Sequence, residues 1–153
     1  MTNKGLSPRL TTILLLLMAW LAMINAATFE KFLRQHVDYP RTEVPDTQRY
    51  CNLMMKRRHM ATSKYCKHLN TFVHMEVPQI QAVCGPAGEP TVGDLRESNS
   101  SFPLTLCKLY RGSWAPDCNY IGTSAVNRII IACEDGYPVH LETEVPGYME
   151  LEE

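Results

Sequence analysis

The segment Cys66-Lys67-His68-Leu69-Asn70-Thr71-Phe72 lies near the middle of the 153-residue chain and holds the second of its six cysteines. No two cysteines are close enough for the CxxC spacing that is typical of zinc sites. An even number of cysteines in a chain that begins with an apolar leader indicates a disulfide framework formed in an oxidising compartment. Their spacing alone does not choose among the pairings. The six are Cys51, Cys66, Cys84, Cys107, Cys118 and Cys133.

Residues 1–26 have the composition of a signal peptide that is cleaved from the mature protein. Lys4 and Arg9 form a basic start, residues 13–24 are an unbroken apolar run, and Ala26 offers a small residue for cleavage. The run is shorter than the roughly 20 residues that span a bilayer, so we expect secretion and no stable membrane association. The remaining residues, 27–153, form one domain by length, and we expect a monomer.

The mature domain is expected to carry a net negative charge. The leader removes two of the chain's 15 basic residues and none of its 16 acidic ones, which changes the net charge from −1 to about −3. Proteins that bind nucleic acid usually carry excess lysine and arginine, so any such function requires a local basic cleft. The candidates for that cleft are Lys31, Arg34, Lys64 and Lys67.

Hydrophobic spacing predicts helices in the first half and strands in the second. Helices are expected at residues 29–37, with Thr28 as the cap, at 47–60, with Asp46 as the cap, and from Pro78 to residue 84. Glycine, proline and serine predict loops over 85–101, which include the N-glycosylation acceptor Asn99-Ser100-Ser101. Strands are expected at 104–110, 118–121, 127–134 and 138–144. This order predicts an α+β domain with an antiparallel sheet.

Two of the five histidines have the context of catalytic groups. His36 lies on the apolar face of the first helix, so we expect its side chain to point towards the body of the protein. His140 and Glu142 lie on one face of the last strand, because successive side chains alternate between faces. A carboxylate beside an imidazole can fix its tautomer and orientation. Sequence spacing alone does not show that the two histidines meet.

The quoted segment fits the signature CKxxNTF and resembles the pancreatic ribonuclease (ribonuclease A) family. The resemblance extends over nearly all of the mature chain: residues 32–36 resemble the family's first helix, residues 138–141 resemble its last strand, and the six cysteines follow the family order. It implies three short helices packed on a bent antiparallel sheet. It also implies the disulfides Cys51–Cys107, Cys66–Cys118 and Cys84–Cys133. The absence of a fourth pair of cysteines resembles angiogenins and six-cysteine non-mammalian ribonucleases.

The resemblance implies a metal-independent and cofactor-independent cleavage of single-stranded RNA. His36 would accept the proton of a ribose 2′-hydroxyl, His140 would protonate the departing 5′-oxygen, and Lys67 would stabilise the negative charge at phosphorus. The product would be a 2′,3′-cyclic phosphate, and DNA, which lacks the nucleophile, would not be cut. The implied substrate-binding residues are Gln35 and the main chain of Leu141 at the phosphate, Asn70 and Thr71 beside the base, Glu142 beside His140, and Glu134 at the second base.

Three positions bear on how close the chain is to each branch of the family. Thr71 would select C or U. Without the resemblance, the ordinary interpretation of this threonine is a β-branched residue in a strand. Thr143 stands at the position where angiogenins have a glutamine that obstructs the pyrimidine pocket, which favours an open pocket. Lys56-Arg57-Arg58 resembles the basic segment of angiogenins, and a solvated helix face explains it equally well.

These observations favour a pyrimidine-selective endoribonuclease. The alternative is an angiogenin-like secreted signalling or host-defence protein with weak ribonuclease activity, and a third hypothesis is an inert binding module on the same scaffold. The expected partner is single-stranded RNA, and a ribonuclease inhibitor is a further candidate.

Overall fold

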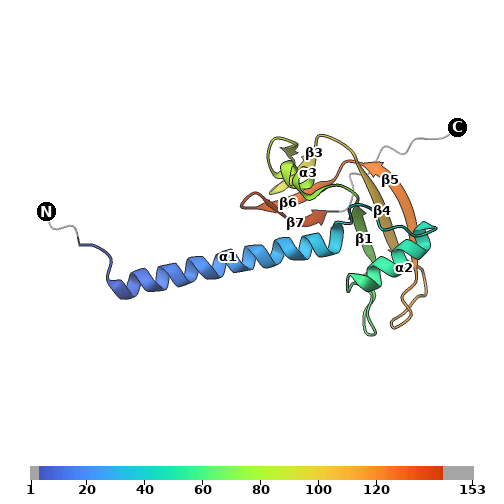
Figure 1. Cartoon of the computed structure of the whole chain (residues 1–153), viewed down its shortest axis with the longest axis horizontal. Coiled ribbons are helices and arrows are strands. Elements are labelled where there is room, and N and C mark those ends of the chain that lie inside the picture. Colours follow the sequence, from blue (N-terminus) through green and yellow to red (C-terminus); the bar gives the residue numbers. More distant parts are fainter. Residues whose placement is uncertain (1–3, 143–153) are drawn as a thin grey trace.

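The computed structural model describes residues 4–142 and, within them, the side chains of all residues except 24–27. Thr143 and the acidic C-terminal tail therefore lie outside the described residues. One long helix projects from a body that contains all other elements (Figure 1). The body consists of two short helices and a 3₁₀ turn packed on two antiparallel sheets.

The first helix, α1, covers Pro8–His36 and is much longer than the predicted helix at 29–37. Ser7 caps it by accepting a hydrogen bond from the Leu10 amide. Its N-terminal part carries exposed apolar side chains, among them Leu16 and Trp20, and runs away from the body. The helix is long and apolar enough to cross a membrane, a property that signal sequences share. Only its last turns pack, and Phe32 is fully buried there.

The other helical elements occur close to their predicted positions. Helix α2 covers Thr47–Arg57 and begins at Asp46, whose side chain accepts a hydrogen bond from the Arg49 amide. It ends three residues before the predicted end. The third predicted helix is divided into α3, Val77–Gln81, and the 3₁₀ turn η1, Ala82–Cys84.

The strands form two sheets. The first has the order β1-β4-β5, with β1 at Leu69–Val73, β4 at Phe102–Leu109 and β5 at Tyr120–Asn127. The second has the order β2-β3-β6-β7, with β2 at Gly88–Pro90, β3 at Leu95–Ser98, β6 at Ile130–Glu134 and β7 at Tyr137–Glu142. All pairings between these strands are antiparallel.

The four predicted strands are present as β4, β5, β6 and β7, with shifted ends. The sequence prediction missed β1, and the expectation of loops over 85–101 was wrong where β2 and β3 lie. Both short strands gain their pairing from neighbours: β3 pairs with β6, and β2 pairs with β3. Glycine and proline suggest loops locally, whereas the ladder to β6 is a tertiary contact that no local pattern reports.

Three disulfides join the helical half of the chain to the strands, in the pairing implied by the resemblance. Cys51 in α2 is bonded to Cys107 in β4, Cys66 to Cys118, and Cys84 at the end of η1 to Cys133 in β6. Their sequence separations are 56, 52 and 49 residues. In the chain-entropy model, closing loops of this length stabilises the fold by about 4 kcal/mol per bridge.

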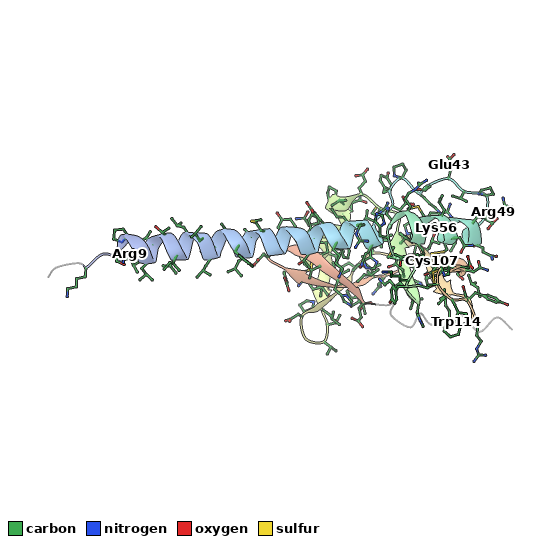
Figure 2. The ribbon with its side chains drawn as sticks, turned by 90° about the horizontal axis from the view of Figure 1, so that it is seen from below. Arg9, Glu43, Arg49, Lys56, Cys107 and Trp114 are labelled. Carbon is green, nitrogen blue, oxygen red and sulfur yellow. A yellow bond between two sulfur atoms is a disulfide. The ribbon has the colours of Figure 1, made fainter. Side chains whose placement is uncertain are left out.

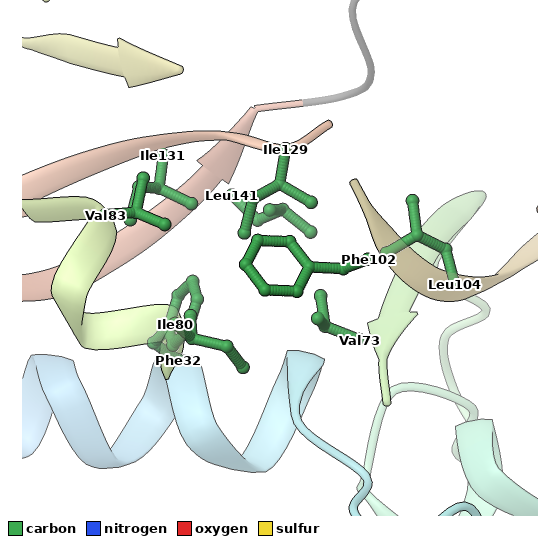
Figure 3. Packing of buried hydrophobic residues seen from close by; sticks show 9 residues of the cluster. All are labelled: Phe32, Val73, Ile80, Val83, Phe102, Leu104, Ile129, Ile131 and Leu141. Atoms are coloured by element: carbon green, nitrogen blue, oxygen red, sulfur yellow. The ribbon is translucent and has the colours of Figure 1, made fainter. Parts of the chain in front are cut away.

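The core has two clusters: one lies between α2 and the sheet β1-β4-β5, and the other lies between α1, α3 and the two sheets. Phe102 of β4 packs among side chains from both sheets, with Phe32 of α1 and Ile80 of α3 on the helical side (Figure 3). The predicted apolar run at 129–131 contributes Ile129 and Ile131, and both are buried. Because α1 and β7 contribute to this one cluster, its packing fixes their relative positions, and each of them carries one of the two candidate histidines.

A two-residue turn positions β7. Asp135 and Gly136 have φ values of 52° and 81°, the conformation of a type I′ hairpin turn, in which aspartate and glycine are favoured. The turn pairs Glu134 with Tyr137 and brings His140 opposite Ala132 in β6. The local sequence thereby sets the register at the start of the strand, and an irregularity between Ala132 and Cys133 shifts it by one residue before His140.

Gly122 of β5 permits the close approach of α2. A Cβ atom at this position would lie 2.2 Å from the main-chain oxygen of Thr47, whose hydroxyl donates a hydrogen bond to the Gly122 oxygen over 2.8 Å. We predict that Gly122→Ala lowers the free energy of unfolding by about 2–3 kcal/mol, because a backbone must move to admit the methyl group. Urea denaturation measures this loss.

Ser124→Ala is the matched control, because Ser124 is an exposed residue of the same strand. It should change stability by less than about 0.5 kcal/mol. Equal stability of the two variants would contradict the close packing of α2 on β5.

Candidate active site

A cleft of about 500 Å³ brings together most of the predicted catalytic and binding residues. Its walls come from the last turns of α1, the segment that leads into β1, β1 itself and the end of β7. The residues that line it are Lys31, Gln35, His36, Tyr65, Lys67, Leu69, Asn70, Thr71, His140, Leu141 and Glu142. The two candidate histidines, distant in the sequence, therefore lie in one cavity.

His36 occupies the buried side of the cleft and is 6% exposed. Its Nδ1 donates a hydrogen bond to the main-chain oxygen of Thr71 over 2.9 Å, because a carbonyl oxygen only accepts. The proton is therefore on Nδ1 and the lone pair on Nε2. Burial lowers the pKa of His36 to about 4, the hydrogen bond to Thr71 opposes this, and the charges of Lys67 and His140 lower it further. His36 is neutral at pH 7.

His140 lies on the opposite, open side of the cleft, and its side chain is 61% exposed. Its Nε2 lies 3.2 Å from Oε2 of Glu142, two residues further along β7. This contact confirms that the two side chains share one face of the strand. When Nε2 donates to the carboxylate, Nδ1 is the nitrogen left for another partner.

Lys67 is held by a short chain of hydrogen bonds. Its Nζ donates to Oδ1 of Asn70 over 3.0 Å, and Nδ2 of Asn70 donates to the main-chain oxygen of Gln35 over 2.8 Å. The Lys67 oxygen accepts a hydrogen bond from the Tyr120 hydroxyl. Burial lowers the pKa of Lys67, and the nearby charges of Lys31 and Arg34 lower it further. Asn70 is 2% exposed, so it orients Lys67 from within the protein.

Thr71 has a buried hydroxyl that finds no hydrogen-bond partner in the part of the chain that the structure describes. Its main-chain oxygen is bonded to His36, and its side chain lies in the wall of the cleft. Leaving a buried hydroxyl unpaired costs about 1–3 kcal/mol. Such an atom in a cavity wall is suited to a ligand that offers a complementary polar edge.

The structure separates other predicted residues from the cleft. Glu134 is exposed at the turn end of β6 and is not among the lining residues, so its contact with a second base stays a prediction. Arg34 donates to the main-chain oxygen of Arg58. Lys64 lines a neighbouring groove, which it shares with Tyr65. No sequence pattern pointed to Tyr65, because an exposed tyrosine in a loop has no distinguishing pattern.

The basic segment Lys56-Arg57-Arg58 is divided between two roles. Arg58 Nη1 donates to three main-chain oxygens at the end of α1, those of Leu33, Arg34 and Val37. A cation at a helix C-terminus pairs with unsatisfied carbonyl groups and with the helix dipole. Arg58 therefore fixes the end of the helix that carries His36, and Lys56 and Arg57 are exposed on α2.

Within residues 4–142, no group of three histidine, cysteine or acidic side chains is arranged to hold a metal ion. All six cysteines are in disulfides.

The family model "Pancreatic ribonuclease" matches residues 27–142 of the chain. A ribonuclease of Chelonia mydas is 56% identical over 117 residues, which cover 76% of this chain and 98% of that protein. An angiogenin of Gallus gallus is 38% identical over 136 residues, which cover 89% of this chain and 94% of that protein. The crystal structure of green turtle egg white ribonuclease superposes with a TM-score of 0.74 at 53% identity, covering 77% of this chain and 98% of that one.

The fold, the three disulfides and these relatives place the chain in one class. The chain belongs to the pancreatic ribonuclease family. The predicted fold class and the predicted disulfide pairing are confirmed, and the prediction of a pancreatic-type ribonuclease is confirmed at the level of the family.

The buried, neutral state of His36 predicts a pH dependence of stability. The pKa of His36 is about 4 in the folded protein and 6.5 in a free side chain, so the unfolded chain binds the proton first as the pH falls. The contribution of neutral His36 to the free energy of unfolding is complete above pH 6.5. It decreases by about 3 kcal/mol as the pH falls from 6.5 to 4. His36→Asn keeps an N–H donor for Thr71 and removes the titration.

Urea denaturation of both proteins between pH 7 and pH 4 measures the difference. Burial also lowers the pKa of His74, so the variant retains part of the slope. The parent must lose more stability than the variant over this range, and parallel curves would contradict a buried neutral His36.

Proposed function

We propose that the protein is a secreted endoribonuclease that cleaves single-stranded RNA on the 3′ side of pyrimidines. The single observation that carries the proposal is the meeting of His36, His140 and Lys67 in one cleft, with one nitrogen of each imidazole already engaged. Two imidazoles and an ammonium group are the groups that a metal-independent phosphoryl transfer needs.

In the first step, Nε2 of neutral His36 accepts the proton of the ribose 2′-hydroxyl. The 2′-oxygen then bonds to phosphorus, the bond from phosphorus to the 5′-oxygen breaks, and protonated His140 gives its Nδ1 proton to that oxygen. The products are a 2′,3′-cyclic phosphate and a free 5′-hydroxyl, and water opens the cyclic phosphate in a second step. Thr71 and Glu142 hold the two rings, so little reorganisation is needed.

Lys67 would stabilise the charge that develops on the phosphoryl oxygens. One of its three N–H donors is used by Asn70, which leaves two for the substrate. Gln35 and the main-chain amide of Leu141 would bind the same phosphate. The pKa of His36 is low in the free protein. A bound phosphate carries the charge opposite to that of Lys67, so it raises the pKa of His36 towards the value that suits a general base.

Three observations support secretion. The leader has the composition of a signal peptide, the match to the family model begins at residue 27, and three disulfides require an oxidising compartment. The proposal therefore divides the chain into a signal peptide, residues 1–26, and a ribonuclease domain, residues 27–153. The mature protein would act as a monomer on single-stranded RNA, and a ribonuclease inhibitor is a candidate partner.

His140→Ala tests the reaction with little risk to folding, because the side chain is largely exposed. We predict a fall in kcat/KM on UpA by about 10²–10⁴-fold, the usual contribution of a general acid. The free energy of unfolding should stay within about 0.5 kcal/mol of the parent's value. His59→Asn is the control, because His59 is exposed outside the cleft and has a φ of 62°, which asparagine tolerates.

Retained turnover in His140→Ala would contradict the assignment of the acid. Feeble turnover of the parent, at the level of an angiogenin, would favour the alternative of a signalling or host-defence protein, for which the angiogenin relatives are the supporting observation.

Thr71→Val tests base selection, because it keeps the branched shape and removes only the hydroxyl. We predict that the preference for UpA and CpA over ApA falls by about tenfold, since one hydrogen bond to the base is lost. The free energy of unfolding should not fall, because the removed hydroxyl has no hydrogen-bond partner among residues 4–142. An unchanged preference would show that the Thr71 hydroxyl does not select the base.

A further inference from the structure

The turn that joins β3 to β4 holds a motif to which the proposed mechanism assigns no role. The motif is Asn99-Ser100-Ser101, the only triplet of the sequence in which serine or threonine stands two positions after an asparagine. Proline in the middle position would block modification, and serine stands there. Such triplets often occur by chance, so the question is whether the folded protein presents this one.

The turn presents the whole triplet to solvent. All three residues are exposed, whereas Ser98 before them and Phe102 after them are buried. The chain therefore reaches the surface for three residues between two strands whose ends are anchored in the protein. A glycosylated asparagine requires such a place, because a glycan is bulky and hydrophilic.

The Asn99 amide can carry a glycan without losing its contact with the protein. Its Nδ2 has two hydrogens and donates to the main-chain oxygen of Pro86 over 3.3 Å, its one hydrogen bond within residues 4–142. A bond to a sugar replaces one of the two hydrogens and leaves the other for Pro86. The folded protein therefore tolerates the modification at the atom that would react.

Hydrogen bonds that do not use the side chains of the triplet hold the turn in shape. The Asn99 amide N–H donates to the Ala87 oxygen over 2.9 Å. The Ser98 hydroxyl donates to the Ser100 oxygen over 2.7 Å and accepts from the Ile129 amide over 2.9 Å. Variants of the triplet's side chains should therefore keep the fold.

The turn lies away from the proposed catalytic cleft. The second sheet has the order β2-β3-β6-β7, so β6 separates β3, which leads into the turn, from β7, which carries His140. The main chain of Asn99 is bonded to Ala87, next to β2 at the opposite edge of the sheet. Asn99 is not among the residues that line the cleft, so a glycan on it would leave the cleft open.

A larger groove beside the cleft would also stay open. It has a volume of about 870 Å³, and Trp114, which is 79% exposed, lines it. The disulfide of Cys118 closes the loop that presents Trp114, and Figure 2 shows this residue at the end of the body opposite to the N-terminal part of α1. Asn99 is not among the lining residues of this groove. The groove is basic, because three exposed cations line it: Lys64, Lys108 and Arg111.

We propose that Asn99 is an N-glycosylation site and is occupied in the secreted protein. The inference rests on the proposed secretion and does not depend on the proposed cleavage of RNA. The three disulfides and the glycan both require passage of the chain through the secretory compartments. The glycan would cover the β3–β4 turn and leave the cleft and the groove accessible.

The modification is a group transfer from an oligosaccharide that is linked to a lipid diphosphate. Nδ2 of Asn99 bonds to the anomeric carbon of the first sugar, and the bond from that carbon to the diphosphate oxygen breaks. The lipid diphosphate leaves with the bonding electron pair, and Nδ2 loses one proton. The Ser101 hydroxyl completes the triplet that the transferring enzyme requires.

Peptide mapping by mass spectrometry tests the proposal on the full chain expressed in cultured vertebrate cells. The peptide that contains Asn99 is measured before and after treatment with a glycosidase that leaves aspartate at each modified asparagine. We expect most of the secreted chains to yield aspartate at this position. Unmodified Asn99 in most of the secreted chains would overturn the proposal.

The two serines of the triplet provide matched variants, because both are exposed and only Ser101 has a required side chain. Ser101→Ala should abolish the glycan, and Ser101→Thr should keep it. Ser100→Ala is the control and should also keep it, since the middle position accepts any residue except proline. A glycan that persists in Ser101→Ala, or disappears in Ser100→Ala, would contradict Asn99 as the acceptor.

Turnover shows whether the glycan leaves the cleft open. The secreted parent, which carries the glycan, and Ser101→Ala, which lacks it, should cleave UpA with the same kcat/KM. A lower value for the parent would overturn the placement of the glycan away from the cleft.

The measurements separate this proposal from the proposed function. A parent that does not cut UpA fails as a ribonuclease, and peptide mapping still decides whether Asn99 is modified. A full chain that does not reach the medium contradicts the signal peptide. Residues 27–153 behind an established secretory leader then decide the site by the same mapping.

Discussion

The last turn of α1 is tied to β1 by two hydrogen bonds, from Nδ1 of His36 to the Thr71 oxygen and from Nδ2 of Asn70 to the Gln35 oxygen. These bonds cross between the first helix and a strand more than 30 residues later, and each uses a residue of the cleft. The same contacts set the tautomer of His36, leave the Thr71 side chain in the cleft wall and place Asn70 against Lys67. Loosening this junction would displace the proposed general base His36, the proposed charge stabiliser Lys67 and the proposed base-reading residue Thr71 together.

Buried polar groups behind the junction keep it in place. Asp38, which follows α1, accepts hydrogen bonds from Tyr50 and from Thr42 and pairs with Arg58, which also binds the end of α1. Burial opposes the charge of Asp38, but these hydrogen bonds outweigh it and hold the pKa of the carboxyl below its usual value. The carboxylate therefore remains charged and paired at neutral pH, which makes the network a rigid support for the site.

The sequence predicted much of the fold and of the candidate site. Hydrophobic spacing placed His36 on the buried face of α1, and strand alternation placed His140 beside Glu142. The signature around Lys67 implied the family and, through it, the disulfides. The missed elements have a common cause. Strands β1, β2 and β3 are short. The partners of β1 and β3 lie far along the chain, and β2 pairs only with β3, which itself depends on β6. The helix at 29–37 was predicted too short, because its apolar N-terminal part was assigned to the leader.

The sequence by itself determined the class of the protein, the helices and strands with strong local patterns, and the residue types available for chemistry. Local physics suffices there, since caps, alternation and the Asp135-Gly136 turn act over a few residues. Only the tertiary structure decided that His36 and His140 share a cleft, that the Thr71 hydroxyl has no hydrogen-bond partner among the described residues and that Trp114 flanks a basic groove beside the cleft. These depend on packing α1, β1 and β7 around Phe102, and on the disulfide that closes the Trp114 loop. Such contacts join distant parts of the chain, and no local pattern contains their geometry.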